Sequence, residues 1–320
     1  MFFKNLCYNI IGGDKTTMEH HQFTDLKVSA ALIIQKRMIN QVDMQEYVRE
    51  ISTYIHAVDN LYIYNMTSQD LSEFYELLKK YTNIFYTTCK DYGEVANYQM
   101  IYEDLFDKGC DFGVIMQQGY YYEEDAFIAL RRYAIKNDTT KIAVITPLPL
   151  RGCEMFSRQE EESRKCMGCN LVGTLVNLKL FKESGGFKLE YYQSMFDYEY
   201  CLRMRHLGNS IILMQNQVLR NSNYKVLEKR VFFIKLQTYD YDLMDLYYQT
   251  RNRFYLWDEY KNIDKAYIKL DKKLYKDERH TMKMRDKHYR DKFYMMEEAK
   301  YDYLRKRMGK YNSGGEANEN

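Results

Sequence analysis

Apolar residues along the first half of the chain alternate between short continuous runs and helical spacing. Five continuous runs predict buried strands, at residues 28–34, 61–65, 83–88, 111–117 and 141–147. Between them, apolar residues recur three and four positions apart, as in the helix expected at 38–55 and in the next one, for which Ser68 is the predicted N-cap. This alternation predicts an α/β fold with a mostly parallel sheet flanked by helices, and such sheets bind ligands at the carboxyl ends of their strands.

In the second half of the chain the predicted elements change from a loop and single helices and strands to a mainly helical region. A polar segment at 148–170 predicts a loop, 194–208 predicts a helix that ends at Gly208, and 210–219 predicts a further strand. From about residue 229 onward the pattern is mainly helical. We therefore divide the chain into an N-terminal extension at 1–26, a main domain at 27–228, a helical basic region at 229–312 and a disordered tail at 313–320.

Charge is spread unevenly, although the net charge of the 320 residues is only +2. Lys261–Lys310 holds 17 Lys and Arg against nine Asp and Glu, and Ile263, Tyr267, Leu270 and Leu274 recur there at helical spacing. The segment is either a solvated amphipathic helix packed on its own domain or a contact with an anionic membrane surface. No basic-aromatic RNA motif and no zinc-finger spacing is present, so a nucleic-acid partner is not expected.

The N-terminus does not resemble a signal peptide, and no apolar run reaches the ~18 residues that span a bilayer. Seven cysteines in such a chain indicate reduced thiols, so we expect a cytoplasmic protein. Cys153, Cys166 and Cys169 could hold zinc, but a single CxxC spacing is weak evidence, and small residues in a loop are the ordinary interpretation.

Two carboxylates open the helix at 194–208, in the stretch SMFDYEYCLRMRHLG: Asp197 and Glu199. A carboxylate held at a helix start on a rigid scaffold can take a proton from a reacting hydroxyl. The structural alternatives are an N-cap for Asp197 and an ion pair of Glu199 with Arg203, four residues later.

Three motifs together resemble the family 2 glycosyltransferases of GT-A fold, in their rhamnosyltransferase-like branch: GTLVNLKLFKESGGF (173–187), FDYEYCLRMRHLG (196–208) and YYQTRNRFYL (247–256). The resemblance covers about 27–312. It implies inverting transfer of a sugar, with rhamnose suggested by the branch, from a nucleotide-sugar donor to a cell-surface glycan or lipid-linked acceptor. It also implies work at the cytoplasmic face of the membrane, and it assigns the base to Asp197, with Glu199 close by.

The chain departs from the family at the donor site. Where the family has an Asp-x-Asp pair this chain has Gln117 and Gln118, Asn65 replaces an Asp after the second strand, and Asn221 stands where a His is usual. Amides are poor ligands for Mg²⁺ and Mn²⁺, which prefer anionic oxygens. We therefore expect no divalent metal and no other cofactor, with Asn65, Gln117 and Gln118 left as donor-binding positions.

Without a metal, the charge of a donor diphosphate would have to be met by protein cations or helix N-termini. Arg203 and Arg251 are the candidates, and Arg205 and Arg253 are close by in the same two motifs. Surface charge is the ordinary interpretation of all four.

Three interpretations follow: a metal-independent glycosyltransferase that uses Asp197, a catalytically inactive homologue that serves as a partner subunit or sugar-binding module, and an unrelated α/β nucleotide- or protein-binding domain. An active enzyme should leave Asp197 facing an open cleft lined by Gln118 and Asn65, whereas in an inactive one Tyr120–Tyr122 could fill that cleft. The third interpretation fails if the sheet has the GT-A strand order.

Overall fold

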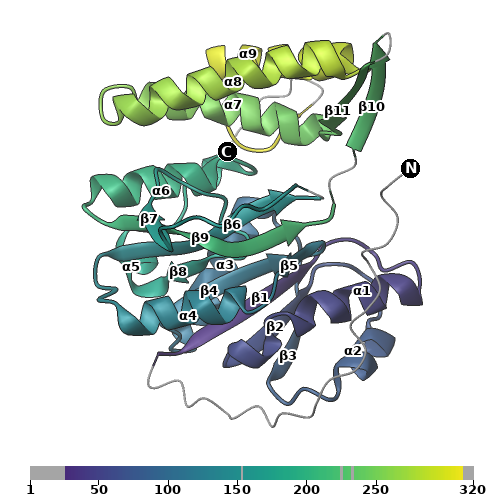
Figure 1. Ribbon diagram of the computed structural model, residues 1–320, viewed down its shortest axis with the longest axis vertical. Coiled ribbons are helices and arrows are strands. Elements are labelled where there is room, and N and C mark those ends of the chain that lie inside the picture. Colours follow the sequence, from purple (N-terminus) through teal and green to yellow (C-terminus); the bar gives the residue numbers. More distant parts are fainter. Residues whose placement is uncertain (1–25, 153, 224–225, 232–233, 313–320) are drawn as a thin grey trace.

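The computed structural model describes residues 26–152, 154–223, 226–231 and 234–312. A sheet flanked by helices forms the main body, and three long helices with a hairpin lie across one end of it (Figure 1). Nearly all of the predicted extension at 1–26, and the predicted tail at 313–320, fall outside the described residues.

The central sheet has nine strands in the order β3-β2-β1-β4-β8-β6-β9-β5, with β7 paired to β9. Six of its strands run parallel: β1 (Val28–Ile34), β2 (Asn60–Asn65), β3 (Ile84–Thr88), β4 (Phe112–Gln117), β6 (Ile142–Arg151) and β9 (Ser210–Asn221). Three short strands run against them: β5 (Tyr120–Tyr122), β7 (Ser163–Lys165) and β8 (Leu175–Asn177). The mostly parallel sheet is therefore as the sequence predicts.

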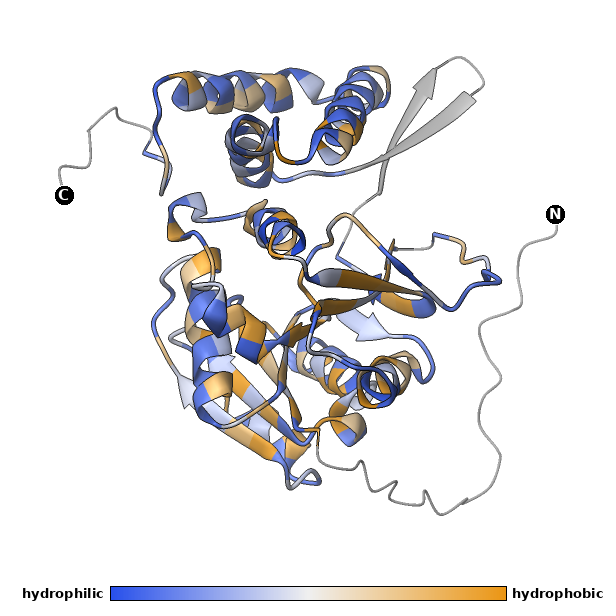
Figure 2. Cartoon of the chain, turned by 90° about the vertical axis from the view of Figure 1, so that its left-hand side faces the viewer, coloured by the Kyte–Doolittle hydropathy of each residue, from blue (hydrophilic) through white to orange (hydrophobic). Residues whose placement is uncertain are grey.

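Helices cover both faces of this sheet, because the side chains of its central strands alternate between two apolar cores. Leu32 of β1 faces the core under one helix set, and Ile33 faces the core under the other. The first set is α1 (Gln41–Ser52), α2 (Ser72–Leu78) and α4 (Ala126–Lys136), and the second is α3 (Glu94–Asp107), α5 (Leu178–Glu183) and α6 (Phe196–His206). Short 3₁₀ turns lie at Ile55–Ala57 and Leu189–Tyr191. Figure 2 shows the apolar residues gathered on the strands and on the helix faces turned toward them.

The C-terminal part begins with a two-stranded hairpin, β10 (Val226–Val231) and β11 (Ile234–Tyr239). Three helices follow: α7 (Leu243–Tyr260), α8 (Lys265–Arg285) and α9 (Tyr289–Leu304). Leu256 and Tyr260 of α7 and Tyr267 and Ile268 of α8 join the core beneath α3 and α6. The helical region thus packs directly on the main domain, and none of the described helices is both long and apolar enough to cross a bilayer.

Three local predictions are wrong. The segment at 229–239 is predicted as helix but pairs as a hairpin, since short apolar runs do not distinguish the two by periodicity. Helix α2 begins at Ser72 rather than after Ser68, because the Asp70 carboxylate accepts bonds from the Ser72 backbone N–H at 3.0 Å and from its hydroxyl at 2.6 Å. Strand β6 continues past Pro147 to Arg151, into the predicted loop, because a register shift there accommodates the proline.

Candidate active site

A cavity of about 410 Å³ opens at the carboxyl ends of β6 and β9, beside the start of α6. Its walls include side chains from β6, β9, the loop before β8, the start of α3 and α7. The polar residues lining it include Glu94, Thr146, Asn170, Ser194, Asp197, Asn221 and Gln249. The cavity therefore lies where a parallel α/β sheet ordinarily binds its ligand.

Asp197 lines this cavity from the first turn of α6, with only 4% of its surface exposed. Its carboxylate accepts a hydrogen bond from the backbone N–H of Tyr198 at 2.8 Å. Burial raises the pKa of Asp197 to about 7, and the nearby charge of Glu94 acts in the same direction. Met195 occupies the N-cap position without a side-chain bond, so Asp197 is not the N-cap of α6.

Glu94, the first residue of α3, faces the same cavity. Its carboxylate accepts a bond from the backbone N–H of Ser194 at 3.0 Å, and burial raises its pKa to about 7. The buried Asp197 and the half-buried Glu94 thus face one cavity, from the starts of α6 and α3. Sequence reasoning missed Glu94, although an acid directly after Gly93 at a predicted helix start was the signal that could have found it.

The loop before Asp197 has an unusual backbone. Three of its non-glycine residues have a positive φ: Tyr192 at 62°, Ser194 at 57° and Met195 at 65°. Such conformations are costly for residues with a Cβ and persist only where the surroundings hold them. Asn252 of α7, fully buried, does so by donating its side-chain amide to the carbonyl oxygens of Tyr191 at 2.9 Å, Gln193 at 2.6 Å and Ser194 at 3.0 Å.

Glu199 is placed away from the cavity. It is fully buried, and its carboxylate pairs with Arg203 at 3.0 Å and Lys188 at 3.2 Å and accepts a bond from the Tyr260 hydroxyl at 3.0 Å. The ion pair expected from the four-residue spacing is therefore present. These contacts tie α6 to α7 and leave no carboxylate oxygen directed at the cavity.

The predicted arginines also lie outside the cavity. Arg203 donates to the carbonyl oxygens of Ser184 and Gly186 in addition to Glu199. Arg251 is 1% exposed, with its guanidinium 5.3 Å from the ring centre of Tyr247 and 5.1 Å from that of Tyr248. Both therefore contribute to packing where the structure places them.

Arg205 pairs with Asp264 at 2.6 Å, at the start of α8. Arg253 pairs with Asp271 at 3.2 Å and with Glu278 at 3.3 Å, and it lines a second cavity described below.

Asn65, Gln117 and Gln118, the residues predicted to bind the donor, take part in local hydrogen bonds. The Asn65 amide donates to the carbonyl of Gln69 at 3.0 Å and accepts from the Thr67 N–H at 2.9 Å. The Gln117 amide donates to the Tyr98 hydroxyl at 3.1 Å and also interacts with the Glu94 carboxylate, which lines the cavity. Among the residues predicted to bind the nucleotide-sugar donor, Gln117 is thus the one that contacts a cavity-lining carboxylate.

Gln118 precedes a glycine with φ of +83°, and the turn is held from both sides. The Gly119 N–H donates to the buried Glu50 carboxylate at 3.0 Å, and the Asn223 amide donates to the Gln118 carbonyl. A Cβ on Gly119 would meet the Asn223 side chain at 2.2 Å, so the turn requires glycine. None of Asn65, Gln117 and Gln118 lines the cavity.

The segment Tyr120–Tyr122 does not fill the cavity, although one of its residues lines it. Tyr120 lines its wall, while Tyr122 is buried in the core and donates its hydroxyl to the Gly173 carbonyl at 2.8 Å. Asp197 thus faces a cavity, but Gln118 and Asn65, which were expected to line it in an active enzyme, do not.

Comparison with known proteins finds no matching family model and no matching curated protein. Solved structures do match. The crystal structure of GalNAc-T7 with UDP, GalNAc and Mn²⁺ has a TM-score of 0.53 at 10% identity, over 74% of this chain and 49% of that one. Residues 1–349 of TarS from S. aureus give 0.45 at 11% identity over 71% of this chain and 64% of that one, and the UDP complex gives 0.47 at 11% over 88% and 72%. The chain thus spans about half the length of the GalNAc-T7 chain.

The expectation that no divalent metal takes part is wrong, since GalNAc-T7, which shares the architecture, was solved with Mn²⁺. The two amides at the β4 turn do not exclude a cation, because a hard cation can take one or two carboxylates together with substrate phosphates. By themselves the side chains do not complete a site: within the described ranges no group of three or more His, Cys, Asp or Glu residues could hold a metal ion.

The strand order and the structural likeness agree on the architecture. A curled, mostly parallel sheet with helices on both faces, and a cavity at its carboxyl edge, gives this chain the GT-A fold of the glycosyltransferases.

Proposed function

We propose that the protein transfers a sugar from a nucleotide-sugar donor to an acceptor hydroxyl with inversion, and that Asp197 is the general base. One observation carries the proposal: the carboxylate lies at the first turn of α6, facing the cavity at the carboxyl edge of a GT-A sheet. Its pKa of about 7 suits a base that works near neutral pH, because general acid–base catalysis is most effective when the pKa of the catalytic group lies near the operating pH.

In this step the acceptor oxygen forms a bond to the anomeric carbon of the donor sugar. The bond from that carbon to the diphosphate oxygen breaks, and its electron pair leaves with the nucleoside diphosphate. The hydroxyl proton passes to the Asp197 carboxylate. Attack from the face opposite the leaving group inverts the anomeric centre. The Asn252 amide, by fixing the loop before α6, keeps the base in place.

Separate observations suggest which donor and which acceptor to test. GalNAc-T7 was solved with UDP and GalNAc, so UDP-sugars are the first donors to test, and a nucleotide-activated rhamnose follows from the rhamnosyltransferase-like motifs. A cell-surface glycan or a lipid-linked acceptor at the inner face of the membrane fits the basic segment 261–310.

The test is nucleoside diphosphate release from a donor panel in the presence of Mn²⁺, with and without acceptors, in the full chain and in two variants. Asp197→Asn is expected to lower turnover about 10²- to 10⁴-fold, the usual contribution of a general base, with UDP affinity largely retained. Asp107→Asn, which changes an exposed carboxylate at the end of α3, is the matched control and is expected to keep turnover. Full turnover in Asp197→Asn would place the base elsewhere.

The second candidate is a catalytically inactive homologue that acts as a partner subunit or sugar-binding module. It is favoured by the amides Gln117 and Gln118 at the β4 turn and by the absence of Asn65 from the cavity wall. UDP or sugar binding without release of nucleoside diphosphate from any donor would support this candidate against the first.

A further inference from the structure

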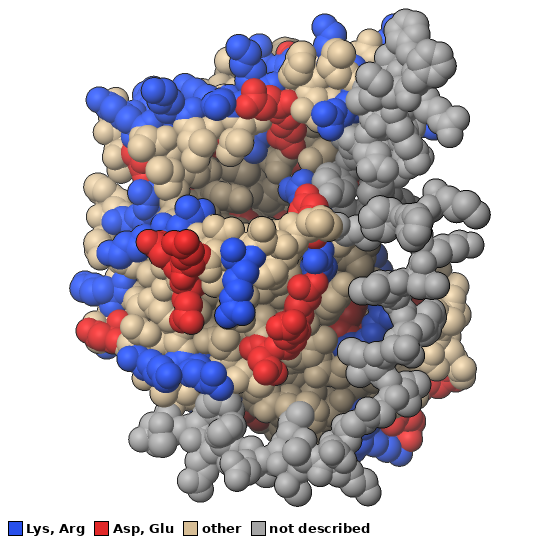
Figure 3. Space-filling view, in the orientation of Figure 1, with Lys and Arg blue, Asp and Glu red and all other residues tan. Residues whose placement is uncertain are grey.

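A second, larger cavity of about 830 Å³ lies between the main domain and the C-terminal helices. Figure 3 shows the molecule hollowed between these two parts. Its walls come from β7 and the loop after it, from the start of α6, and from the inner faces of α7 and α8. The volume falls in the ~300–1,000 Å³ range of small-molecule sites.

The two cavities share part of their walls. Tyr198, the residue directly after Asp197, lines both, as do Met195, Gln249 and Arg151. A ligand in the larger cavity can therefore extend one end toward the Asp197 carboxylate.

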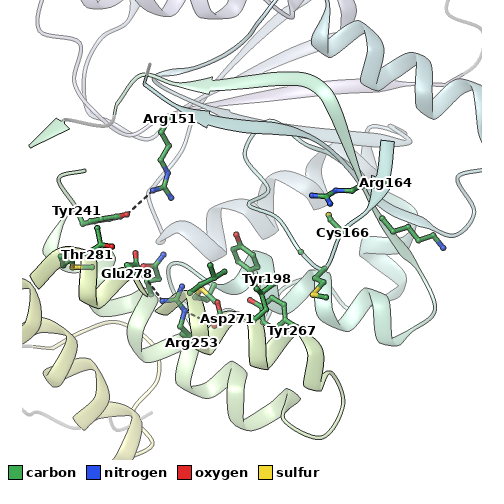
Figure 4. A pocket seen from close by; sticks show the side chains of 18 of the residues that line it. Arg151, Arg164, Cys166, Tyr198, Tyr241, Arg253, Tyr267, Asp271, Glu278 and Thr281 are labelled. Atoms are coloured by element: carbon green, nitrogen blue, oxygen red, sulfur yellow. Dashed lines mark hydrogen bonds and ion pairs between the residues drawn. The ribbon is translucent and has the colours of Figure 1, made fainter. Parts of the chain in front are cut away.

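The charged side chains that line the larger cavity are five cations and two acids: Arg151, Arg164, Lys165, Arg253 and Arg285, with Asp271 and Glu278. Both acids are paired with one cation, Arg253, at 3.2 and 3.3 Å. Arg164 is exposed and makes no ion pair with any residue that the structure describes. Figure 4 shows Arg164 and Arg151 on opposite sides of the space above Tyr198. The cavity thus carries an excess of positive charge.

The same walls suit a sugar. Tyr198, Tyr241 and Tyr267 line the cavity, and aromatic rings present an apolar face with a polar edge. Tyr267 is only 5% exposed and its hydroxyl is enclosed by the protein, so its ring packs in the wall and offers little polar surface to a ligand.

We propose that the larger cavity binds an anionic saccharide, whose acidic groups lie near Arg164 and whose reacting hydroxyl reaches Asp197 from the Tyr198 side. This rests on the proposed function in assigning the saccharide as acceptor, and it adds the chemical class of that acceptor.

Binding is measured with two probes of equal length, tetragalacturonate and maltotetraose, by calorimetry and by fluorescence. Trp257 is the only tryptophan of the chain, and its indole N–H donates to the cavity-lining Asp271 at 2.6 Å, so it reports on the cavity. Tetragalacturonate is expected to bind at least about tenfold more tightly than maltotetraose, as for one hydrogen bond to a charged group.

The variants locate the site. Arg164→Ala is expected to weaken tetragalacturonate binding about tenfold and to leave maltotetraose unchanged, whereas Arg164→Lys retains most of the affinity because the charge is kept. Lys179→Ala, which removes a cation from the exposed face of α5, is the control and should change nothing.

Equal affinity for the two probes, or an equal loss in the Arg164 and Lys179 variants, would overturn the proposal. Nucleoside diphosphate release is measured separately. Preference for tetragalacturonate without turnover would leave the cavity assignment standing while the catalytic proposal fails, and turnover without that preference would do the reverse.

Discussion

The Asp197→Asn variant is expected to be more stable than the wild-type protein at pH 8, although it lacks the proposed base. In the folded state the pKa of Asp197 is about 7, against 3.8 for an unperturbed aspartate. Between these values the folded protein binds more protons than the unfolded chain, so stability falls as pH rises from about 4 to 7. Asparagine has the shape of the protonated acid and no charge to bury, so the variant avoids this loss.

The magnitude follows from the shift. One pKa unit corresponds to about 1.4 kcal/mol, so a shift of about three units sets an upper limit of about 4 kcal/mol above pH 7. Because pH 5 lies between the pKa values of the unfolded and folded states, part of this stability is already lost at pH 5. The stability difference between variant and wild type should therefore grow by up to about 3 kcal/mol between pH 5 and pH 8.

Urea unfolding at the two pH values measures this difference for the wild type, Asp197→Asn and the control Asp107→Asn. The control changes an exposed carboxylate and should show a difference from wild type that is the same at both pH values. If the Asp197→Asn difference does not grow with pH, Asp197 is solvated in the folded protein and the reasoning on its burial is refuted.

Three further predictions concern the same region. The kcat/KM of the wild type should rise with pH and level off above about pH 7, because the Asp197 carboxylate must be ionised to act as base; a flat profile from pH 5 to 9 would contradict this. Asn252→Ala should lower the free energy of unfolding by about 2–3 kcal/mol, since buried carbonyl oxygens lose their donor, and should lower kcat more than UDP affinity; kinetics equal to wild type would show that the loop holds itself. Arg203→Ala should cost about 3 kcal/mol in thermal or urea unfolding, because the buried Glu199 keeps only Lys188 as a cation partner; a loss below 1 kcal/mol would show that Lys188 and the Tyr260 hydroxyl are enough to hold this carboxylate.

The main domain could be predicted from its sequence because burial on both faces leaves a simple signature. Strand β1 (Val28–Ile34) is apolar at nearly every position, and Asp, Glu and Lys return in the helices and turns between strands. The hairpin at 226–239 could not be predicted in the same way. Its short apolar run fits either a helix or a strand, and the pairing of β10 with β11 decides between them.

The site was only partly predictable for a related reason. Asp197 has a local signature, an acid at a helix start after a turn, and the structure places it in the cavity. Glu94 reaches the same cavity from a helix a hundred residues earlier, and only the packing of α3 against the loop before α6 brings it there. Arg203 and Arg251 have the charge that a diphosphate needs, but Glu199 and a stack of tyrosine rings already engage them.

The bonds from Asn252 to the loop before α6 have a consequence for how the chain can be divided. The backbone that aims Asp197 is held in part by a helix that begins after residue 242, so a truncated protein ending near residue 228 would contain the whole sheet but not the anchor of its reactive carboxylate. A displacement of these C-terminal helices would therefore reach the loop before Asp197 through Asn252, and through the neighbouring bonds of Gln193 with Asp245 and of Glu199 with Tyr260.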